Sequence, residues 1–357
     1  MSKKPLILGI ESSCDETAAS IISENDQGYP IILSNIVSSQ ADVHKEFGGV
    51  VPELAARSHI EKLDSIVQKA IDDSEINIKD IDAVASTAGP GLIVCLSVGL
   101  SFGKAFAASL KKPFIAVNHL EGHALSPKLN SELDYPYLLL LISGGHSQYL
   151  SVNNLSEYQR LGTTIDDAIG EAFDKTAKLL GLEFPGGPQI EVLAKKGNPN
   201  KYNLPKPIFN KGGCNLSFAG LKTAILKITK NIKTDQEKFD LAASFQKTIE
   251  EILYKKTKIA FSEFEKQNKI KEKKFVVAGG VAANKNIRSM LEKLCIEENY
   301  HSIFPPIELC GDNAAMIALV GLEKFKIKQF DNLNHPAKPR WSLDENAAFL
   351  KGAGVKI

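Results

Sequence analysis

A repeated unit of strand, small polar turn and strand constrains the fold of this chain most strongly. The first copy consists of the apolar segment Leu6–Ile10, a polar turn and the apolar segment Thr17–Ile22. The second copy consists of Tyr137–Ile142, the turn Ser143–His146 and the returning segment Ser147–Val152. Short apolar runs bounded by small polar residues are typical of β-hairpins. The repeat favours two α/β lobes, each opening with a hairpin whose turn could face a common cleft; one large α/β domain is the alternative.

Helical periodicity follows each predicted hairpin. Apolar residues recur at helical spacing over Arg57–Ile71, and an Ala/Gly/Ser-rich helix is expected over Ser97–Leu110. A proline-containing link near Ser126–Pro136 precedes the second copy, where Asp166–Leu180 is expected to be helical and long Lys-rich helical stretches follow. Strands that alternate with helices predict mixed α/β lobes.

The overall charge is nearly balanced, but its distribution is not. The 357 residues carry 43 Lys+Arg and 42 Asp+Glu, a net charge of +1, and taken whole this balance indicates no nucleic-acid partner. Residues 195–274, however, contain 19 Lys, no Arg and 8 Asp+Glu, a local charge of +11 on a body of −10. We call this segment the Lys-rich block. It is either an RNA-facing surface or a solvated helical face.

The five cysteines are widely spaced and form no CxxC pair, which argues against a disulfide framework or a zinc knuckle and favours a reducing, cytoplasmic location. The apolar run near the N-terminus is interrupted by Glu11, so we expect no signal peptide. The longest apolar run, Tyr135–Ile142, is far shorter than the roughly 20 residues that span a bilayer, and we expect no membrane association.

The sequence His119-Leu-Glu-Gly-His123 places two imidazoles four residues apart, on one face of a helix that Asn118 can cap. The order differs from HExxH, so the glutamate base of a zinc peptidase is missing. Asp312 lies in a turn just before an apolar helix and is the candidate third ligand. Two histidines and one carboxylate leave coordination positions open, as a catalytic iron(II) or zinc site requires. Two unrelated surface histidines are the alternative.

Three glycine-rich turns, at Ser143–His146, Pro185–Pro188 and Gly279–Ala283, follow apolar segments. Without Cβ atoms the backbone can approach a phosphate or a ribose closely, and its N–H groups can bind an anion. Neither GxGxxG nor GxxxxGK[ST] occurs, which disfavours a Rossmann dinucleotide site and a P-loop.

The turn from Glu11 to Thr17 concentrates carboxylates and hydroxyls, and Asp15 or Glu16 could hold a metal-bound water or accept a proton. A solvated hairpin tip is the alternative. Cys14 has no evident neighbouring base and is interpreted as an incidental thiol. The remaining histidines without an evident partner are interpreted as surface or packing residues: His59, His301 and His335.

Nine ordered segments together resemble one family. These segments are GIESSCDETA (9–18), HKEFGGVVPELAARSH (44–59), STAGPGL (86–92), VNHLEGH (117–123), LLISGGHSQ (140–148), TTIDDAIGEAFDKTAKLLGLEFPGGP (163–188), LSFAGLKTA (216–224), AGGVAANKNIR (278–288) and CGDNAAMIA (310–318). The chain resembles the tRNA N6-adenosine threonylcarbamoyltransferases, formerly called O-sialoglycoprotein endopeptidases or glycoproteases, of the bacterial or organellar type. The resemblance covers about residue 6 to about residue 342.

The resemblance implies an α/β fold of the actin/Hsp70/sugar-kinase type, with two ribonuclease-H-like lobes around a nucleotide cleft. On this basis we expect a first lobe over 1–128 and a second lobe with a Lys-rich helical insertion over 129–325. A C-terminal segment, 326–357, is expected to pack back on the first lobe.

The resemblance also assigns residues. It implies metal ligation by His119, His123 and Asp312, and it places Asp15 at a position implicated in activity. Donor-binding positions fall on Ile142, Ser143, Gly144, Gly145, His146, Asp174, Gly187 and Asn284. The family often carries Asp where this chain has Glu191, a carboxylate one carbon longer, in the same donor site.

The implied reaction moves the threonylcarbamoyl group from threonylcarbamoyl-adenylate to N6 of adenosine 37, in tRNAs that read codons starting with A. One divalent metal ion per subunit is expected, with Fe(II) favoured over Zn(II). The expected partners are the tRNA anticodon loop and either a paralogous inactive subunit with a small P-loop ATPase or a second copy in a homodimer.

Three other functions compete with this hypothesis. A small-molecule kinase or ATPase of the same fold would need neither the histidine pair nor RNA. A metalloprotease would need a base that the sequence does not show. A non-catalytic assembly subunit would be expected to lack the metal ligands, all of which are present here.

Overall fold

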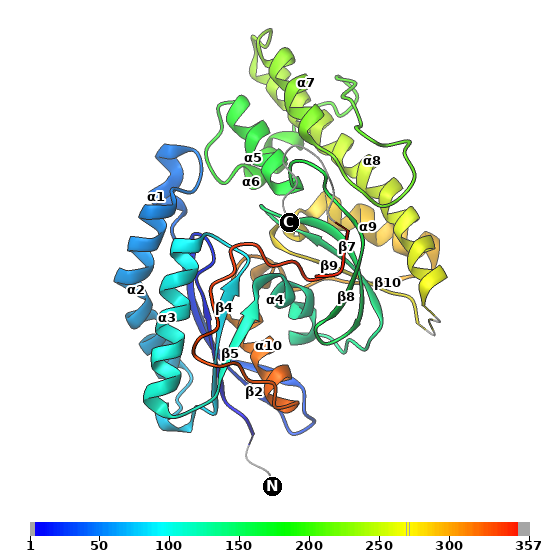
Figure 1. The fold of residues 1–357 in the computed structure, drawn as a ribbon. Coiled ribbons are helices and arrows are strands. Elements are labelled where there is room, and N and C mark those ends of the chain that lie inside the picture. The colour runs from blue at the N-terminus through cyan, green and yellow to red at the C-terminus, as the bar shows by residue number, and fades with distance from the viewer. Residues whose placement is uncertain (1–3, 269, 271, 349–357) are drawn as a thin grey trace. The chain divides into compact units, whose positions relative to one another are not determined.

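The computed structural model describes residues 4–268, 270 and 272–348, and its contacts divide the chain into two compact units (Figure 1). Unit 1 comprises Met1–Leu133 and Gly311–Glu345, and unit 2 comprises Asp134–Cys310 and Asn346–Ile357. The domain boundaries expected from the sequence, after residues 128 and 325, remain a prediction.

Unit 1 is built on a five-stranded sheet in the order β3-β2-β1-β4-β5. The strands are β1 (Ile7–Glu11), β2 (Glu16–Glu24), β3 (Pro30–Ser39), β4 (Ala83–Gly89) and β5 (Phe114–Asn118). The first hairpin is present as predicted, with Ile7 opposite Ile22 in the antiparallel β1–β2 pair. β4 and β5 extend the sheet in parallel with β1, so the carboxyl ends of these three strands meet at one edge.

Helices cover both faces of this sheet. They are α1 (Ala41–His44), α2 (Pro52–Asp73), α3 (Ile93–Leu110), α4 (His119–Leu125) and α10 (Ala314–Lys326), with 3-10 turns at Lys45–Phe47, Ile78–Asp80 and Ser126–Leu129. Successive residues of a strand point to opposite faces. Leu8 of β1 accordingly packs in a core cluster with Leu63 of α2 and Leu100 of α3. Gly9 approaches α10 on the other face.

Unit 2 repeats the same sheet topology with the order β10-β9-β6-β7-β8. The strands are β6 (Tyr137–Ile142), β7 (Ser147–Asn154), β8 (Glu157–Thr163), β9 (Lys274–Ala278) and β10 (His301–Ile303). β6, β7 and β8 pair antiparallel, whereas β9 and β10 extend the sheet in parallel with β6. The second predicted hairpin is therefore the counterpart of the first, in an equivalent position of its own sheet.

The helices of unit 2 are α5 (Ile169–Leu179), α6 (Gly186–Ala194), α7 (Ala219–Thr229), α8 (Asp235–Gln267) and α9 (Lys285–Glu298), with 3-10 turns at Gly280–Ala283 and Ile307–Leu309. The longest, α8, begins at a capping box in which Thr234 and Glu237 satisfy each other's backbone N–H groups. Its buried face includes Phe245, Ile249 and Leu253, which join the core of this unit.

One helix, α3, is long and apolar enough by length and composition to cross a membrane. It packs on β4 and α2, and its residues Leu100 and Ala107 are buried in the core of unit 1. Core helices of folded domains commonly have this composition, so the observation is weak support for a membrane span.

Candidate functional sites

The histidine pair lies on α4, directly after β5. The side chain of Asn118 caps this helix by accepting a hydrogen bond from the Leu120 N–H at 2.9 Å. His119 and His123 are therefore one helical turn apart on the same side of α4, with ring centroids separated by 4.7 Å. Both rings are buried, His123 completely. The alternative of two unrelated surface histidines is wrong.

Asp312 reaches these rings from the start of α10. The following residue, Asn313, caps α10 by accepting a hydrogen bond from the Met316 N–H at 3.1 Å, which fixes the turn that carries Asp312. Gly122 of α4 allows the two helices to approach closely: a Cβ atom at this position would lie 3.1 Å from Ile317 and Met316 side-chain atoms. Glycine at this position thus contributes to the approach of the ligand-bearing elements.

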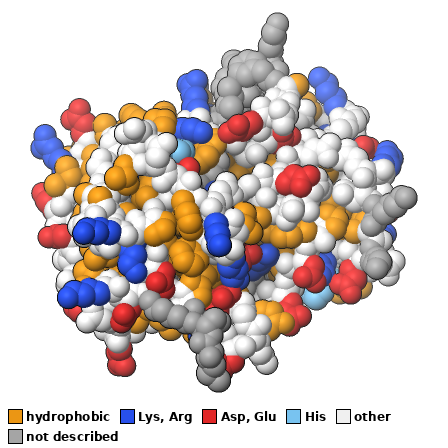
Figure 2. Space-filling model, turned by 60° about the horizontal axis from the view of Figure 1, so that its bottom comes forward, with side chains coloured by type: hydrophobic (Ala, Val, Ile, Leu, Met, Phe, Trp, Pro, Cys, Tyr) orange, Lys and Arg blue, Asp and Glu red, His pale blue; other side chains and the backbone are white. Residues whose placement is uncertain are grey.

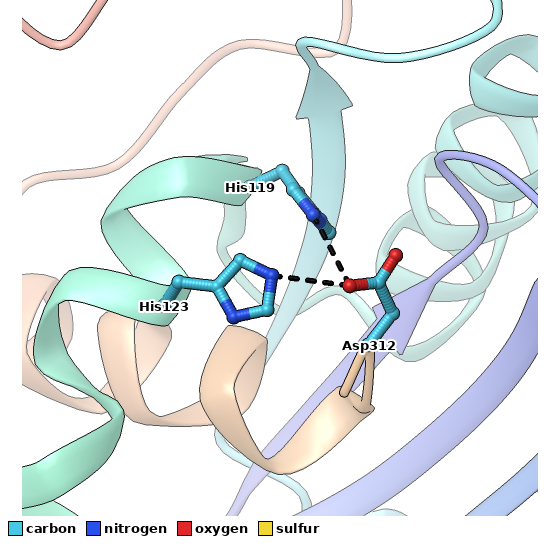
Figure 3. Close-up of side chains that lie close together, drawn as sticks. All are labelled: His119, His123 and Asp312. Atoms are coloured by element: carbon cyan, nitrogen blue, oxygen red, sulfur yellow. Dashed lines mark hydrogen bonds and ion pairs between the residues drawn. The ribbon is translucent and has the colours of Figure 1, made fainter. Parts of the chain in front are cut away.

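The three side chains converge on one point (Figure 3). The Oδ1 atom of Asp312 lies 3.0 Å from Nε2 of His123 and 3.5 Å from Nε2 of His119. Ligands of a four-coordinate ion at about 2.1 Å are themselves roughly 3.4 Å apart. The three donor atoms all lie within 4.8 Å of one another and are therefore close enough to bind a single divalent cation.

The electrostatics of this group favour positive charge. Burial opposes ionisation of Asp312, but the adjacent His119 and His123 outweigh it and hold the pKa of the carboxyl well below its usual range. Burial likewise opposes protonation of His119, but Glu11 and Asp312 outweigh it and raise the pKa of the imidazole well above its usual value. A bound cation would replace the proton that His119 otherwise holds between these carboxylates.

Glu16, at the start of β2, lies near enough to Asp312 to be affected by its charge, and Asp15 lies beside Glu16. Burial, followed by the charges of Asp312 and Asp15, raises the pKa of Glu16 to about 9, and Glu16 is hydrogen-bonded to Asp15. Glu16 is consequently protonated at neutral pH. Burial raises the pKa of the Cys14 thiol well above its usual value, consistent with an unreactive thiol.

His59 is a packing residue, one of the two roles expected for it, but it has polar partners that the sequence did not show. His59 is completely buried, its Nδ1 lies 2.7 Å from the Thr17 hydroxyl, and its Nε2 lies 3.0 Å from the Cys14 carbonyl oxygen. Through these two contacts the ring, which is carried by α2, holds the β1–β2 turn in place. The sequence could not show this because 42 residues separate His59 from Thr17.

In unit 2, the predicted donor-binding turn lies between β6 and β7. The Ser143 N–H donates to the His146 carbonyl oxygen at 2.8 Å, and the His146 N–H donates to the Ser143 hydroxyl at 3.1 Å. Gly144 and Gly145 have open space where a Cβ would lie. The start of α5 abuts this turn, because the Gly170 N–H donates to the Ser143 carbonyl oxygen at 3.2 Å.

Two further predicted residues, Asp174 and Gly187, lie at the α5–α6 connection. Oδ1 of Asp174 accepts a hydrogen bond from the Gly186 N–H at 2.8 Å, which secures the start of α6. Gly187 follows on α6 and has open space at its Cβ position. Backbone N–H groups at such a helix start can bind an anion.

Ile142 lies against the third glycine turn. A Cβ on Gly279, whose φ is +95°, would lie 2.4 Å from the Ile142 carbonyl oxygen, so this turn and the 142–146 turn are adjacent. Asn284, by contrast, uses its side chain to cap α9 and to donate to Gln246 at 3.3 Å. Glu191 lies 3.7 Å from the Lys195 ammonium on α6.

Sequence reasoning assigned no role to Glu11 and Thr87, which the structure brings to the histidine pair. Oε2 of Glu11 lies 3.0 Å from Nδ1 of His119 and accepts a hydrogen bond from the Thr87 hydroxyl at 2.6 Å. The parallel β1–β4 register, with Ile10 beside Ser86, makes Glu11 and Thr87 neighbours. Glu11 and Thr87 could have been identified as neighbours only from the pairing of β1 with β4, which was not predicted from the sequence.

Comparisons with known proteins identify the family of this chain. The family model described as tRNA N6-adenosine threonylcarbamoyltransferase (TsaD) matches residues 31–319. The protein of that name from Pelagibacter ubique (strain HTCC1062) is 79% identical to this chain over the full length of both. The protein of that name from Rickettsia rickettsii (strain Sheila Smith) is 53% identical over 95% of this chain and 98% of the relative. In Brucella anthropi the identity is 50%, over 98% of each chain.

Solved structures confirm the predicted two-lobe α/β fold. The full-length HypF structure covers 93% of this chain and 48% of its own, with a TM-score of 0.58 and 14% identity. Component A of the Acidaminococcus fermentans (R)-2-hydroxyglutaryl-CoA dehydratase covers 90% of this chain and 98% of its own, with a TM-score of 0.50 and 14% identity. At such identity these two likenesses show the fold alone. The family model and the full-length relatives show more: the chain belongs to the tRNA N6-adenosine threonylcarbamoyltransferase family.

Proposed function

We propose that this protein transfers the threonylcarbamoyl group of threonylcarbamoyl-adenylate to N6 of adenosine 37 in tRNAs that read codons starting with A, forming N6-threonylcarbamoyladenosine. The observation that carries the proposal is the 79% identity over the full length to a relative of that name. The convergence of His119, His123 and Asp312 supports it, since this site agrees with the metal centre that the resemblance implies.

In this reaction the N6 nitrogen attacks the carbonyl carbon of the mixed anhydride, the bond from that carbon to the AMP oxygen breaks, and N6 loses one proton. AMP is a good leaving group, whereas the lone pair of N6 is delocalised into the adenine ring. The protein must therefore orient N6, accept its proton and stabilise the oxyanion that develops on the carbonyl. Access to N6 in an anticodon loop requires an unstacked base rather than a duplex.

The chain offers groups for each task. The open backbone at Gly144, Gly145 and Gly187 suits the adenylate of the donor. Asp15 is our candidate for the proton acceptor, because Glu16, with a pKa of about 9, holds its own proton at neutral pH. We propose that Asn284 and Glu191 lie next to the donor-binding backbone and do not bind the donor through their polar groups. The side chain of Asn284 already donates to Gln246, and that of Glu191 lies beside Lys195.

His119, His123 and Asp312 would hold one divalent cation, which when bound would act as a Lewis acid toward donor oxygens. The set of two imidazoles and one carboxylate suits Fe(II) or Zn(II), and following the family resemblance we propose Fe(II), with Zn(II) as the alternative. The five thiols are free, which is in keeping with the cytoplasmic location that we propose. We further propose that the protein works with a paralogous inactive subunit and a small P-loop ATPase, or as a homodimer.

The test is to supply the purified protein, with its proposed partner proteins, with threonylcarbamoyl-adenylate and unmodified tRNA, and to analyse the nucleosides by mass spectrometry. We expect N6-threonylcarbamoyladenosine at position 37 and release of AMP. The competing kinase function predicts instead transfer of labelled γ-phosphate from ATP to a small molecule, without any change of the tRNA. That result, together with unmodified adenosine, would overturn the proposal.

A further inference from the structure

Three hydrogen-bond donors converge on the carboxylate of Glu11, which is completely buried at the end of β1. The Ser13 N–H donates to Oε1 at 2.5 Å and the Thr87 hydroxyl donates to Oε2 at 2.6 Å. Oε2 also lies 3.0 Å from Nδ1 of His119. These contacts fix both oxygens of the carboxylate from three sides, so Glu11 has a single defined orientation against the His119 ring.

The ring of His119 has its two nitrogens directed to different acids. Nδ1 lies against Glu11, and Nε2 lies 3.5 Å from Oδ1 of Asp312. An ionised carboxylate only accepts hydrogen bonds, so the nitrogen against Glu11 carries a proton, and Nε2 is the nitrogen left to ligate a cation on the side of Asp312 and His123. The Ser13 hydroxyl, 3.3 Å from the same Nδ1, can join this contact as a second acceptor.

The second histidine has no such support. Nδ1 of His123 is buried without a hydrogen-bond partner among the residues that the structure describes, whereas its Nε2 faces Asp312 at 3.0 Å. Within the ligand set, His119 is therefore the imidazole whose orientation is set by an acidic neighbour. Glu11, which contacts His119, is itself hydrogen-bonded to Thr87 on β4, a strand that contributes no ligand.

We propose that Glu11, held by Thr87 and the Ser13 N–H, is a positioning residue for the cation site: it orients His119 and selects the tautomer whose Nε2 can bind the metal ion. This inference rests on the proposed function, because it requires that His119, His123 and Asp312 bind a cation. Partners of this kind on the second nitrogen of a ligating histidine typically change metal affinity by about 10- to 100-fold.

Glu11→Gln is the informative substitution, since it keeps the shape of the side chain and leaves one acceptor oxygen where three donors meet. If the amide nitrogen takes the Oε1 position, it opposes the Ser13 N–H. If it takes the Oε2 position, it faces Nδ1 of His119 and favours the tautomer with the proton on Nε2, which cannot ligate. Either arrangement weakens the cation site while preserving the packing volume.

The experiment titrates the metal-free full-length protein with Co(II), following the visible absorption of the bound ion and competition with a chelator. We expect Glu11→Gln to bind Co(II) about 10- to 100-fold more weakly than the unmodified protein, with a changed absorption spectrum. Glu323→Gln is the matched control, because it makes the same change at a carboxylate of α10 that pairs with Lys128 and Lys326. Its affinity should equal that of the unmodified protein.

Two further variants keep the test decisive if Glu11→Gln does not fold. Thr87→Val retains the acid but removes the hydroxyl that fixes Oε2, and should weaken Co(II) binding by up to about tenfold. Glu11→Asp retains the charge but shortens the side chain, and should also bind more weakly. Unchanged affinity in Thr87→Val and Glu11→Asp, or in Glu11→Gln, would overturn the positioning role alone. If neither the unmodified protein nor His119→Ala binds Co(II), the metal centre would be overturned as well.

Discussion

His59 illustrates how a single buried side chain supports the turn that carries Asp15 and Glu16. Its Nε2–H donates to the Cys14 carbonyl oxygen, and its Nδ1 faces the Thr17 hydroxyl and the Gln40 amide nitrogen. Burial is the largest influence on this imidazole and lowers its pKa below the ordinary value, although Cys14 and nearby acids oppose the shift.

The lowered pKa of His59 predicts an acid-sensitive contribution to stability. The unfolded chain takes up a proton on this imidazole below about pH 6.5, whereas the folded protein does so only at a lower pH. The contribution of His59 to the free energy of unfolding is therefore present above about pH 6.5 and is lost as the pH falls below it. We expect His59→Gln to have a lower urea midpoint than the unmodified protein at pH 7.5, with the difference narrowing at pH 5.5. A difference that stays constant across this range would show that His59 does not titrate as inferred.

At the residue scale, the sequence predicted the grouping of His119, His123 and Asp312 better than the residues that support it. His119 and His123 share a helical spacing that a sequence displays directly, and Asp312 stands at a recognisable helix start. Glu11 and Thr87 are 76 residues apart and meet only through the pairing of β1 with β4. Such contacts depend on strand register, which a local pattern does not encode.

Helix α10 is the element that delivers Asp312, and its position depends on glycine in the strand beneath it. A Cβ on Gly9 of β1 would lie 2.5 Å from the Ala314 carbonyl oxygen and 2.5 Å from the Ala318 nitrogen. Both are backbone atoms, so the helix itself would have to move. The hairpins, α4 and the start of α10 could be predicted from periodicity and caps, but this close approach could not, because it involves two elements far apart in sequence.

Gly9→Ala should therefore destabilise unit 1 by about 1–3 kcal/mol and displace Asp312 from the histidines. We expect a lower thermal midpoint and weaker Co(II) binding in the same preparation. Gly212→Ala is the matched control, because no atom lies within 4 Å of the added Cβ. Equal stability of the two variants would contradict the packing of α10 described here.

At the scale of the whole molecule, the near-neutral charge conceals differences between surfaces. Within the Lys-rich block, several lysines of α8 and its surroundings are paired with acids, as Lys258 is with Glu298 at 2.7 Å. Lys222, Lys227 and Lys230, on or next to α7, are exposed. On the face drawn in Figure 2, basic and acidic side chains are interspersed. An RNA-binding role is thus best tested on the α7 lysines.

Reversing the charge of Lys222, Lys227 and Lys230 together, by substitution with Glu, should weaken tRNA binding. If these lysines contact phosphates, the slope of log affinity against log salt should fall by roughly 2–3, about 0.7–0.9 per contact. The same reversal at Lys69, Lys79 and Lys111, exposed residues of unit 1, controls for net charge. Identical salt dependence in the two triple variants would identify the α7 lysines as a solvated face.

The central claim is that a cation held by His119, His123 and Asp312 serves the transfer of threonylcarbamoyl to tRNA. The most direct measurement determines bound metal and N6-threonylcarbamoyladenosine formation in the same preparations of the unmodified protein, His123→Ala and Glu323→Gln. We predict about one metal ion per chain and product formation in the unmodified protein and in Glu323→Gln, and the loss of both in His123→Ala. Full product formation by His123→Ala without bound metal would contradict the claim.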